Sequence, residues 1–184
     1  MNAMVSKDNL PPTAISRIDL GGQYLTFMLG GELYAIGILN VKEIIAYGDL
    51  TEVPMMPEFV RGVINLRGSV VPVIDLQSRF GKGNTAIAKR TGIVIVETGA
   101  LSGDDEAHQD IGIVVDAVNE VVDVAQQDIE PPPTFGAGIR PDFISGMAKR
   151  NGRFVILLNT DKVLSVEEMT SLSKHNMESL AASE

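Results

Sequence analysis

The stretch that decides the fold class is Phe59-Val-Arg-Gly-Val-Ile-Asn-Leu-Arg-Gly-Ser-Val-Val-Pro-Val-Ile-Asp-Leu76. It holds two short apolar runs, Gly62–Leu66 and Ser69–Leu76, separated only by Arg67-Gly68. Short runs rich in Val and Ile and bounded by turn residues are typical of β-strands. Glycine at the break can supply the positive φ that a tight turn needs. This stretch therefore predicts a β-hairpin with Arg67 at its tip.

Similar short runs, bounded by glycine, proline or polar residues, occur along most of the chain. They are Tyr24–Leu29, Leu33–Ile38, Ile44–Tyr47, Gly92–Glu97, Ile111–Val115, Val121–Val124, Ile144–Ala148 and Arg153–Leu158. Many short strands without long helices between them predict an all-β fold built of barrels or a sandwich.

Two short helical segments are also expected. Ser165 stands three residues before Glu168, which is the spacing of a capping box, and apolar residues follow at helical spacing. This pattern predicts a C-terminal helix from about Ser165 to Lys174. A further helical turn is expected over Leu39–Glu43.

Polar segments divide the chain. We expect residues 1–22 to form a mobile N-terminal tail and residues 176–184 a C-terminal tail. Gly81–Arg90 is expected to be a linker, and Gly99–Asp110 an acidic loop. Glu130–Pro133 must be extended, because proline fixes φ and donates no backbone hydrogen bond.

The composition excludes several classes of protein. Among 184 residues there are no cysteines and two histidines, so disulfide frameworks, cysteine-based metal sites and thiol nucleophiles are ruled out. The net charge of −9 disfavours nucleic acid and anionic membrane as partners. No signal peptide or membrane span is evident, so we expect a soluble cytoplasmic protein without direct membrane insertion.

The two halves of the chain resemble each other. A shift of 77 residues places Ile36–Ile45 on Ile113–Val122. A shift of 84 residues places Phe59–Val63 on Phe143–Met147, and Gly68–Asp75 on Gly152–Asn159. Matched glycines and phenylalanines make chance similarity between Val/Ile-rich strands the weaker explanation. Two small, similar all-β lobes follow, and each is so small that we expect them to share one core.

The repeat isolates an unusual residue in the first hairpin. The second copy has Asn151-Gly152 between two apolar runs, which is a strong hairpin signal, where the first has Arg67-Gly68. Asn tolerates a left-handed backbone, whereas Arg adopts it at a cost of about 1 kcal/mol. Turn chemistry alone would not select Arg67 if both turns have the same type. Arg67 either contributes to a binding site or pairs with a nearby carboxylate and holds its lobe together, and these roles are compatible.

From Tyr24 to about Leu172 the chain resembles the CheW family of coupling proteins in bacterial chemotaxis. The opening motif carries most of this resemblance, supported by Tyr34–Ile38 with Val41–Ile44, then Ile111–Asp116, then Glu130-Pro131. The resemblance implies two intertwined five-stranded SH3-like β-barrels with a shared hydrophobic core. We expect a CheW-like domain over residues 23–175, with lobes at about 23–80 and 91–160.

The resemblance also implies a function and partners. It implies a non-catalytic adaptor that links the cytoplasmic hairpin tips of chemoreceptors to the regulatory domain of the histidine kinase CheA in membrane-associated arrays. A monomer is expected for the protein alone. The residues that contact the kinase stay undetermined. A coupling module of a related chemosensory pathway with a non-flagellar output, or a small β-barrel enzyme, are the alternatives.

The receptor-binding set expected from this resemblance is Val41, Glu43, Gly62, Asn65 and Arg67. Val41 is expected to be an apolar anchor, and Glu43 and Arg67 to pair across the wall of the receptor groove. Asn65 is expected to bond either the receptor backbone or its own turn.

No catalytic residue, cofactor or metal site is expected. The segment Gly81–Ala86 matches a loose dinucleotide pattern, but a strand follows too soon for the helix that such a site needs. The carboxylates of Asp104–Asp110 lack the ligand spacing of a calcium loop.

Overall fold

The computed structural model describes residues 21–98, 109–132 and 139–165. The expected C-terminal helix, apart from Ser165, lies outside these residues. So do residues 1–20 of the expected N-terminal tail, the C-terminal tail 176–184, and all of the acidic loop except its last two residues, which belong to a strand.

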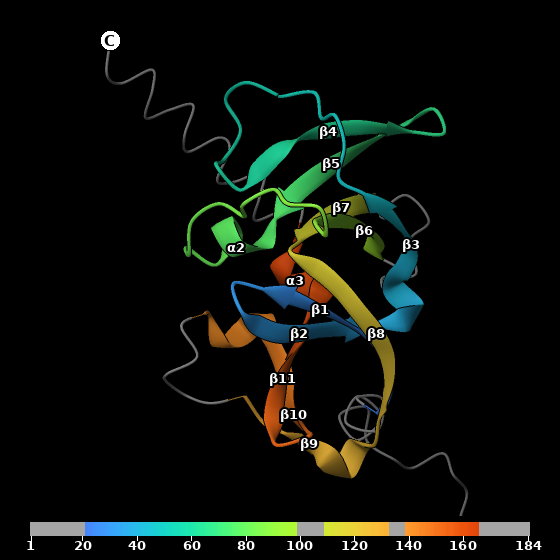
Figure 1. Cartoon of the computed structure of the whole chain (residues 1–184), viewed down its shortest axis with the longest axis vertical. Coiled ribbons are helices and arrows are strands. Elements are labelled where there is room, and N and C mark those ends of the chain that lie inside the picture. The colour runs from blue at the N-terminus through green and yellow to red at the C-terminus, as the bar shows by residue number, and fades with distance from the viewer. Residues whose placement is uncertain (1–20, 99–108, 133–138, 166–184) are drawn as a thin grey trace, which may run out of the picture.

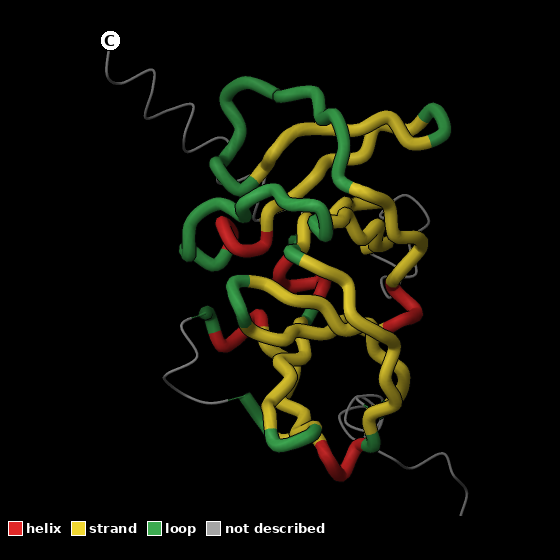
Figure 2. Tube along the Cα trace, in the orientation of Figure 1, coloured by secondary structure: helices red, strands yellow, loops and turns green. Residues whose placement is uncertain are grey.

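Strands dominate the molecule, as predicted. They are β1 (Gly22–Leu29), β2 (Glu32–Gly37), β3 (Val41–Ala46), β4 (Val60–Leu66), β5 (Ser69–Asp75), β6 (Gly92–Thr98), β7 (Gln109–Val115), β8 (Ala117–Val124), β9 (Ile129–Glu130), β10 (Ile144–Arg150) and β11 (Arg153–Leu158). The described helices are single turns: η2 (Ile38–Asn40), α2 (Leu76–Arg79), η4 (Gln126–Asp128), η5 (Pro141–Phe143) and α3 (Thr160–Val163) (Figure 2).

The helical turn expected over Leu39–Glu43 is wrong in its placement. The turn covers Ile38–Asn40, and Glu43 lies in strand β3. The β-branched residues that follow Asn40 form a ladder with β6, in which Val41 opposes Val96. Pairing with a neighbouring strand therefore overrides the local preference for a longer turn.

The strands form two sheets, one above the other along the long axis of the molecule (Figure 1). The upper sheet has the order β3-β6-β7-β5-β4, and the lower sheet β8-β1-β2-β11-β10-β9. We call these the upper and lower barrels. Each combines strands from both copies of the repeat, because the hairpin β6–β7 of the second copy joins β3, β4 and β5 of the first. The lobe boundaries near 23–80 and 91–160 therefore separate the repeats but do not delimit the barrels.

The hydrophobic core follows from this exchange of strands. A small apolar cluster fills each barrel, with Ile93 and Val73 in the upper one and Tyr24 and Leu157 in the lower one. A larger cluster between the barrels takes residues from both copies, from Leu25 to Leu164. The expectation of a shared core is thus confirmed.

The expected linker Gly81–Arg90 contains no helix or strand and is exposed apart from Thr85, which anchors it to the fold. Thr85 is 3% exposed, and both its N–H and its hydroxyl donate to the carboxylate of Asp75, at 2.7 and 2.8 Å. The same carboxylate caps α2 by accepting from the N–H groups of Gln77 and Ser78. A buried carboxylate requires such donors, and here they fix the path of the connection.

Candidate functional site

The β4–β5 hairpin has the strained turn that the repeat predicts. Arg67 has φ of 53°, and Asn151, its counterpart in the β10–β11 hairpin, has φ of 52°. Glycines with positive φ follow both residues. Since the two turns share one backbone geometry, Arg67 adopts a left-handed conformation that Asn would adopt at lower cost.

The side chain of Asn65 supports this turn. Its Oδ1 accepts a hydrogen bond from the N–H of Gly68 at 2.9 Å. Of the two partners expected for Asn65, the structure therefore shows its own turn.

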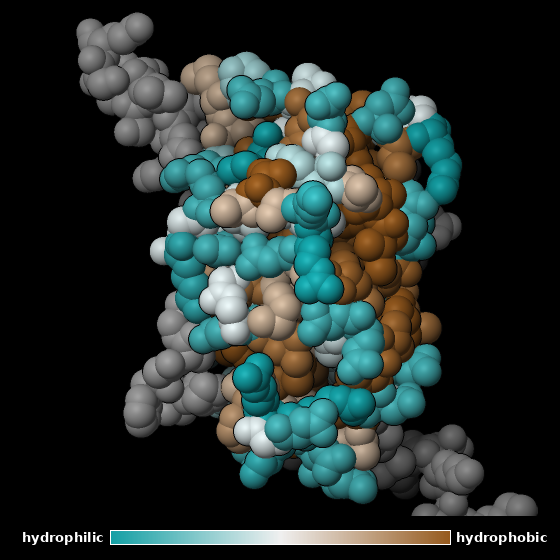
Figure 3. All heavy atoms as spheres, viewed as in Figure 1, coloured by the Kyte–Doolittle hydropathy of each residue, from teal (hydrophilic) through white to brown (hydrophobic). Residues whose placement is uncertain are grey.

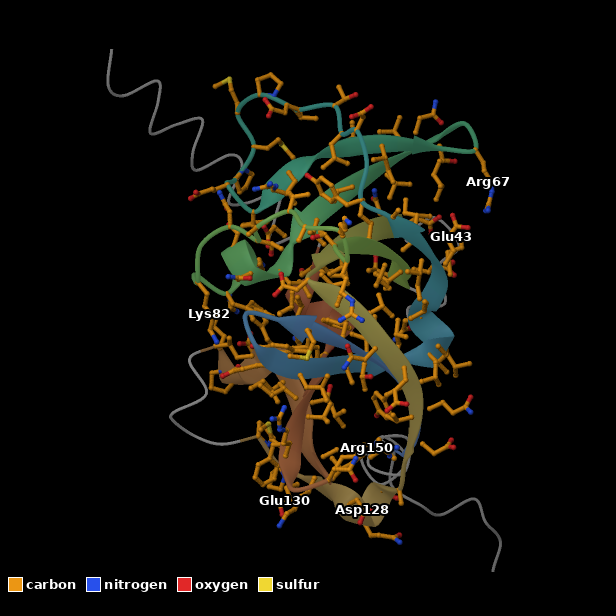
Figure 4. The ribbon with its side chains drawn as sticks, viewed as in Figure 1. Glu43, Arg67, Lys82, Asp128, Glu130 and Arg150 are labelled. Atoms are coloured by element: carbon orange, nitrogen blue, oxygen red, sulfur yellow. The ribbon has the colours of Figure 1, made fainter. Side chains whose placement is uncertain are left out.

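Arg67 and Glu43 form an ion pair between the hairpin and strand β3. Nη2 of Arg67 donates to Oε2 of Glu43 at 2.7 Å, and Figure 4 shows the two side chains pointing toward each other. The guanidinium side chain is 79% exposed and the carboxylate side chain 23% exposed. The second carboxylate oxygen, Oε1, is buried and has no hydrogen-bond partner. The pairing expected from sequence is confirmed, and it presents a cation to solvent beside a half-buried anion.

Strand β3 positions Glu43 through a local irregularity. The pairing of β3 with β6 shifts register between Val41 and Glu43, as a β-bulge does. Val41 is half-buried and packs against the shared core. Next to Glu43, the ammonium of Lys42 bonds Asp110 at 3.0 Å, which raises the pKa of Lys42 above its usual value.

Gly62 lies away from the ion pair. It is five residues from Arg67 along β4, about 16 Å at the rise of a strand. A Cβ atom at Gly62 would lie 2.5 Å from the carbonyl oxygen of Thr51, and φ is 151°. Thr51 exchanges two backbone hydrogen bonds with Val63 at 2.9 and 2.8 Å. In the structure, Gly62 therefore gives the β3–β4 loop room to pair with β4.

Exposed apolar side chains that the sequence did not lead us to expect lie on β3 and β5, which adjoin the ion pair, and on η2 and β8. We call Leu39, Ile44, Val70 and Val121 the apolar flank; they are 97%, 47%, 69% and 48% exposed. Figure 3 shows apolar surface along the side of the molecule where β3 and β8 lie. Ile44 and Val121 occupy matching positions of the repeat, so both barrels contribute to this surface. Ile44 and Val121 each follow a glutamate at matching positions of the repeat, and this is a signal that could have indicated them.

The described residues show no metal centre and no membrane span. Among them, no group of three or more His, Asp or Glu side chains is arranged to hold a metal ion. None of the described helices is long and apolar enough to cross a membrane.

Comparison with known proteins identifies the family. Residues 23–168 match the family model described as CheW-like domain. The chain is 35% identical over 150 residues to the chemotaxis protein CheW of Klebsiella aerogenes, covering 82% of this chain and 86% of that protein. It is 33% identical over 155 residues to CheW of Treponema pallidum, with coverage of 82% and 86%. The structure resembles the crystal structure of the scaffolding protein TtCheW from Thermoanaerobacter tengcongensis, with a TM-score of 0.66, 38% identity and coverage of 76% and 85%.

Proposed function

This chain belongs to the CheW-like family of chemotaxis scaffold proteins, and on that premise we propose that it couples chemoreceptors to the histidine kinase CheA. In this role the protein has no catalytic activity of its own. It is cytoplasmic and is recruited to receptor arrays at the membrane. It binds the helical hairpin tips of receptors and the regulatory domain of CheA.

The observation that carries this proposal is the Glu43–Arg67 pair beside the apolar flank. A helical segment that docks on a protein surface uses apolar anchors for affinity and polar groups for register. Ile44 and Val121 offer apolar contacts from both barrels, and Arg67 offers an exposed guanidinium whose position Glu43 holds. Val41 supports this surface from the shared core. The receptor site therefore comprises Val41, Glu43 and Arg67, with Asn65 and Gly62 shaping the backbone around them.

The repeat provides a matched control for the role of Arg67. Arg67→Ala removes the guanidinium, whereas Asn151→Ala changes the equivalent turn residue in the other hairpin, with nearly the same φ. We expect Arg67→Ala to weaken binding of a receptor cytoplasmic fragment by about tenfold while CheA binding is kept, since one charge-assisted contact contributes about 1.5 kcal/mol. Asn151→Ala should bind the receptor fragment normally. Arg67→Lys should restore binding only in part, because lysine lacks the planar fork of arginine.

Titrations of both partners, with circular dichroism melts of each variant, test this proposal. An Arg67→Ala protein that is folded and binds the receptor fragment as tightly as wild type would limit Arg67 to a structural role. Loss of receptor binding in Asn151→Ala as well would show that turn stability, and not the guanidinium, controls binding.

The contact with CheA is proposed to be mainly apolar and to involve the end of one barrel. Contacts between exposed charges weaken strongly with salt, whereas apolar contacts do not. CheA binding measured at low and moderate salt should therefore change little. A tenfold or greater loss of CheA affinity would contradict an apolar contact.

A further inference from the structure

Arg79 connects the two barrels through its guanidinium group. It is the last residue of α2, which follows β5 of the upper barrel. Its Cζ atom lies 5.0 Å from the ring centroid of Phe59 and 4.8 Å from that of Phe143. Its Nε donates a hydrogen bond to the carbonyl oxygen of Val163 at 3.3 Å. We call Arg79, the two rings and the Val163 carbonyl the inter-barrel clamp.

The two rings of the clamp belong to different barrels. Phe59 precedes β4 of the upper barrel, and its carbonyl accepts from the N–H of Asp75 at 2.7 Å. Phe143 precedes β10 of the lower barrel, and its carbonyl accepts from the N–H of Asn159 at 2.8 Å. Both rings are buried. The guanidinium therefore bridges two rings whose backbones are each fixed within their own barrel.

The repeat shows that the clamp joins equivalent positions. A shift of 84 residues places Phe59 on Phe143 and Arg79 on Val163. Arg79 thus contacts the phenylalanine of its own copy, the phenylalanine of the other copy and the backbone of its own counterpart. The valine side chain has no polar group, so the second copy cannot make the reverse contact. The bridge exists once in the molecule, and one substitution can remove it.

The angle between the barrels needs a directional contact of this kind. The two sheets share no strand pairing within the described residues, and the chain passes between them twice, through η2 and at Asp116. The large apolar cluster holds the barrels together, but burial of apolar surface is not directional. The ammonium of Lys82 lies 3.7 Å from the carboxylate of Glu32, and such partly exposed pairs contribute little. A planar guanidinium that stacks on aromatic faces has a fixed orientation.

The proposed receptor site depends on the angle between the barrels. Ile44 lies on β3 of the upper barrel and Val121 on β8 of the lower one, so a receptor hairpin contacts both only at a suitable angle. The clamp is on a different side of the molecule, because Figure 1 shows α2 at the left and both β3 and β8 at the right.

We propose that Arg79 is a positioning residue, which fixes the angle between the barrels and thereby controls receptor binding without touching the receptor. The effect on receptor binding rests on the proposed coupling function. The effect on the angle between the barrels does not.

Three variants isolate the clamp. Arg79→Lys keeps the positive charge but lacks the planar group that stacks on rings, and Arg79→Met removes the charge as well. Arg140→Met is the matched control. The Cζ atom of Arg140 lies 4.4 Å from the centroid of the same Phe143 ring, but Arg140 is the N-cap of η5 and comes from the same barrel as that ring. Both methionine substitutions change the net charge equally.

The relative placement of the barrels can be measured directly. The chain has no cysteine, so Ser69→Cys on the upper hairpin and Gln127→Cys on η4 add two unique spin-label sites, both exposed. Double electron–electron resonance should give the same narrow distance distribution with and without Arg140→Met. It should give a shifted or broader distribution for each Arg79 variant. This measurement needs no partner, so it tests the clamp even if the proposed coupling function fails.

Binding by the unlabelled variants tests the positioning role. We expect both Arg79 variants to bind a receptor cytoplasmic fragment about fivefold more weakly, as when the competent angle is populated about one-fifth of the time. CheA binding should match wild type, because that contact is proposed to involve the end of one barrel. Arg140→Met should match wild type with both partners.

Unchanged distance distributions in both Arg79 variants would overturn the inference. So would a changed distribution with receptor binding as tight as wild type, since the angle would then not control binding. The same change in Arg140→Met would assign the effect to the Phe143 ring and not to the bridge, and would also overturn it. Circular dichroism melts identify the folded variants, and Arg79→Lys decides the question if Arg79→Met does not fold.

Discussion

The strongest stability prediction concerns the two N-cap residues that the repeat places at equivalent positions, Asp75 and Asn159. Asp75 is fully buried, and its carboxylate accepts four hydrogen bonds. Asn159 caps α3 through a single, exposed hydrogen bond from the N–H of Lys162. Substitution by alanine therefore removes four hydrogen bonds at Asp75 but one at Asn159.

The expected magnitudes follow from these contacts. Loss of an N-cap lowers the free energy of unfolding by about 1 kcal/mol, and Asn159→Ala should cause no larger decrease. Asp75→Ala also leaves the N–H of Thr85 buried without the acceptor it has in the structure, and it leaves the Thr85 hydroxyl with only a long 3.4 Å bond to Oε1 of Gln77. An unsatisfied buried donor costs about 1–3 kcal/mol. After partial relaxation of the loop, we expect Asp75→Ala to lower the free energy of unfolding by about 3–5 kcal/mol. For a chain of this size, 1 kcal/mol corresponds to about 2–4 °C in Tm.

Urea denaturation followed by circular dichroism measures both changes. Hydrogen exchange at the N–H of Thr85 provides a local readout, because this amide should lose protection in Asp75→Ala and keep it in Asn159→Ala. Equal losses of stability in the two variants would refute the reasoning. They would show that the Asp75–Thr85 bonds add nothing beyond the helix cap.

Three further predictions concern strain, close packing and ionisation. Arg67→Asn should keep the free energy of unfolding, measured by urea denaturation, within about 1 kcal/mol of wild type, because relief of backbone strain offsets the loss of an exposed ion pair. A larger decrease in the free energy of unfolding would show that the ion pair stabilises the barrel. Gly62→Ala should lower the free energy of unfolding by about 2 kcal/mol or more, because the new Cβ atom would clash with the carbonyl oxygen of Thr51. Gly68→Ala should lower it by only about 1 kcal/mol, because φ is 87° there but no atom lies within 4 Å of the new Cβ atom. Equal melting temperatures of the two variants would argue against the clash. Burial and the charge of Glu32 raise the pKa of Tyr34 above that of an exposed phenol. Because Tyr34 then loses its proton more readily in the unfolded chain, the free energy of unfolding should fall as the pH rises above about 10. A denaturation midpoint that stays constant above that pH would contradict this.

Local sequence patterns determined most of the secondary structure. Runs of Val and Ile bounded by turn residues predicted ten of the described strands. They do so because β-branched side chains favour an extended backbone locally and glycine permits the turns between strands. Among the described strands, only the two-residue β9 did not show this pattern, since its pairing with Met147 and Ala148 is a tertiary contact. The repeat also identified Arg67 as unusual for its turn, and the structure shows the positive φ that makes it so.

The candidate site was determined only in part by the sequence. Opposite charges and the family resemblance indicated that Glu43 and Arg67 pair, and they do. Their placement depended on β3 pairing with β6, which moved Glu43 from the expected helical turn into a strand. The exposure of Ile44 was not predicted, because an apolar residue in a strand faces core or solvent according to what packs on it.

Which copy of the repeat pairs with which was decided by the tertiary structure alone. The sequence determined that two similar sets of strands exist, but both sets have the same pattern, so either could complete either barrel. The structure exchanges the hairpins β1–β2 and β6–β7 between the copies and buries one large apolar cluster between the barrels. The physical reason is that burial depends on which surfaces meet in space, whereas hydrophobic periodicity indicates only which residues of a strand form its apolar face.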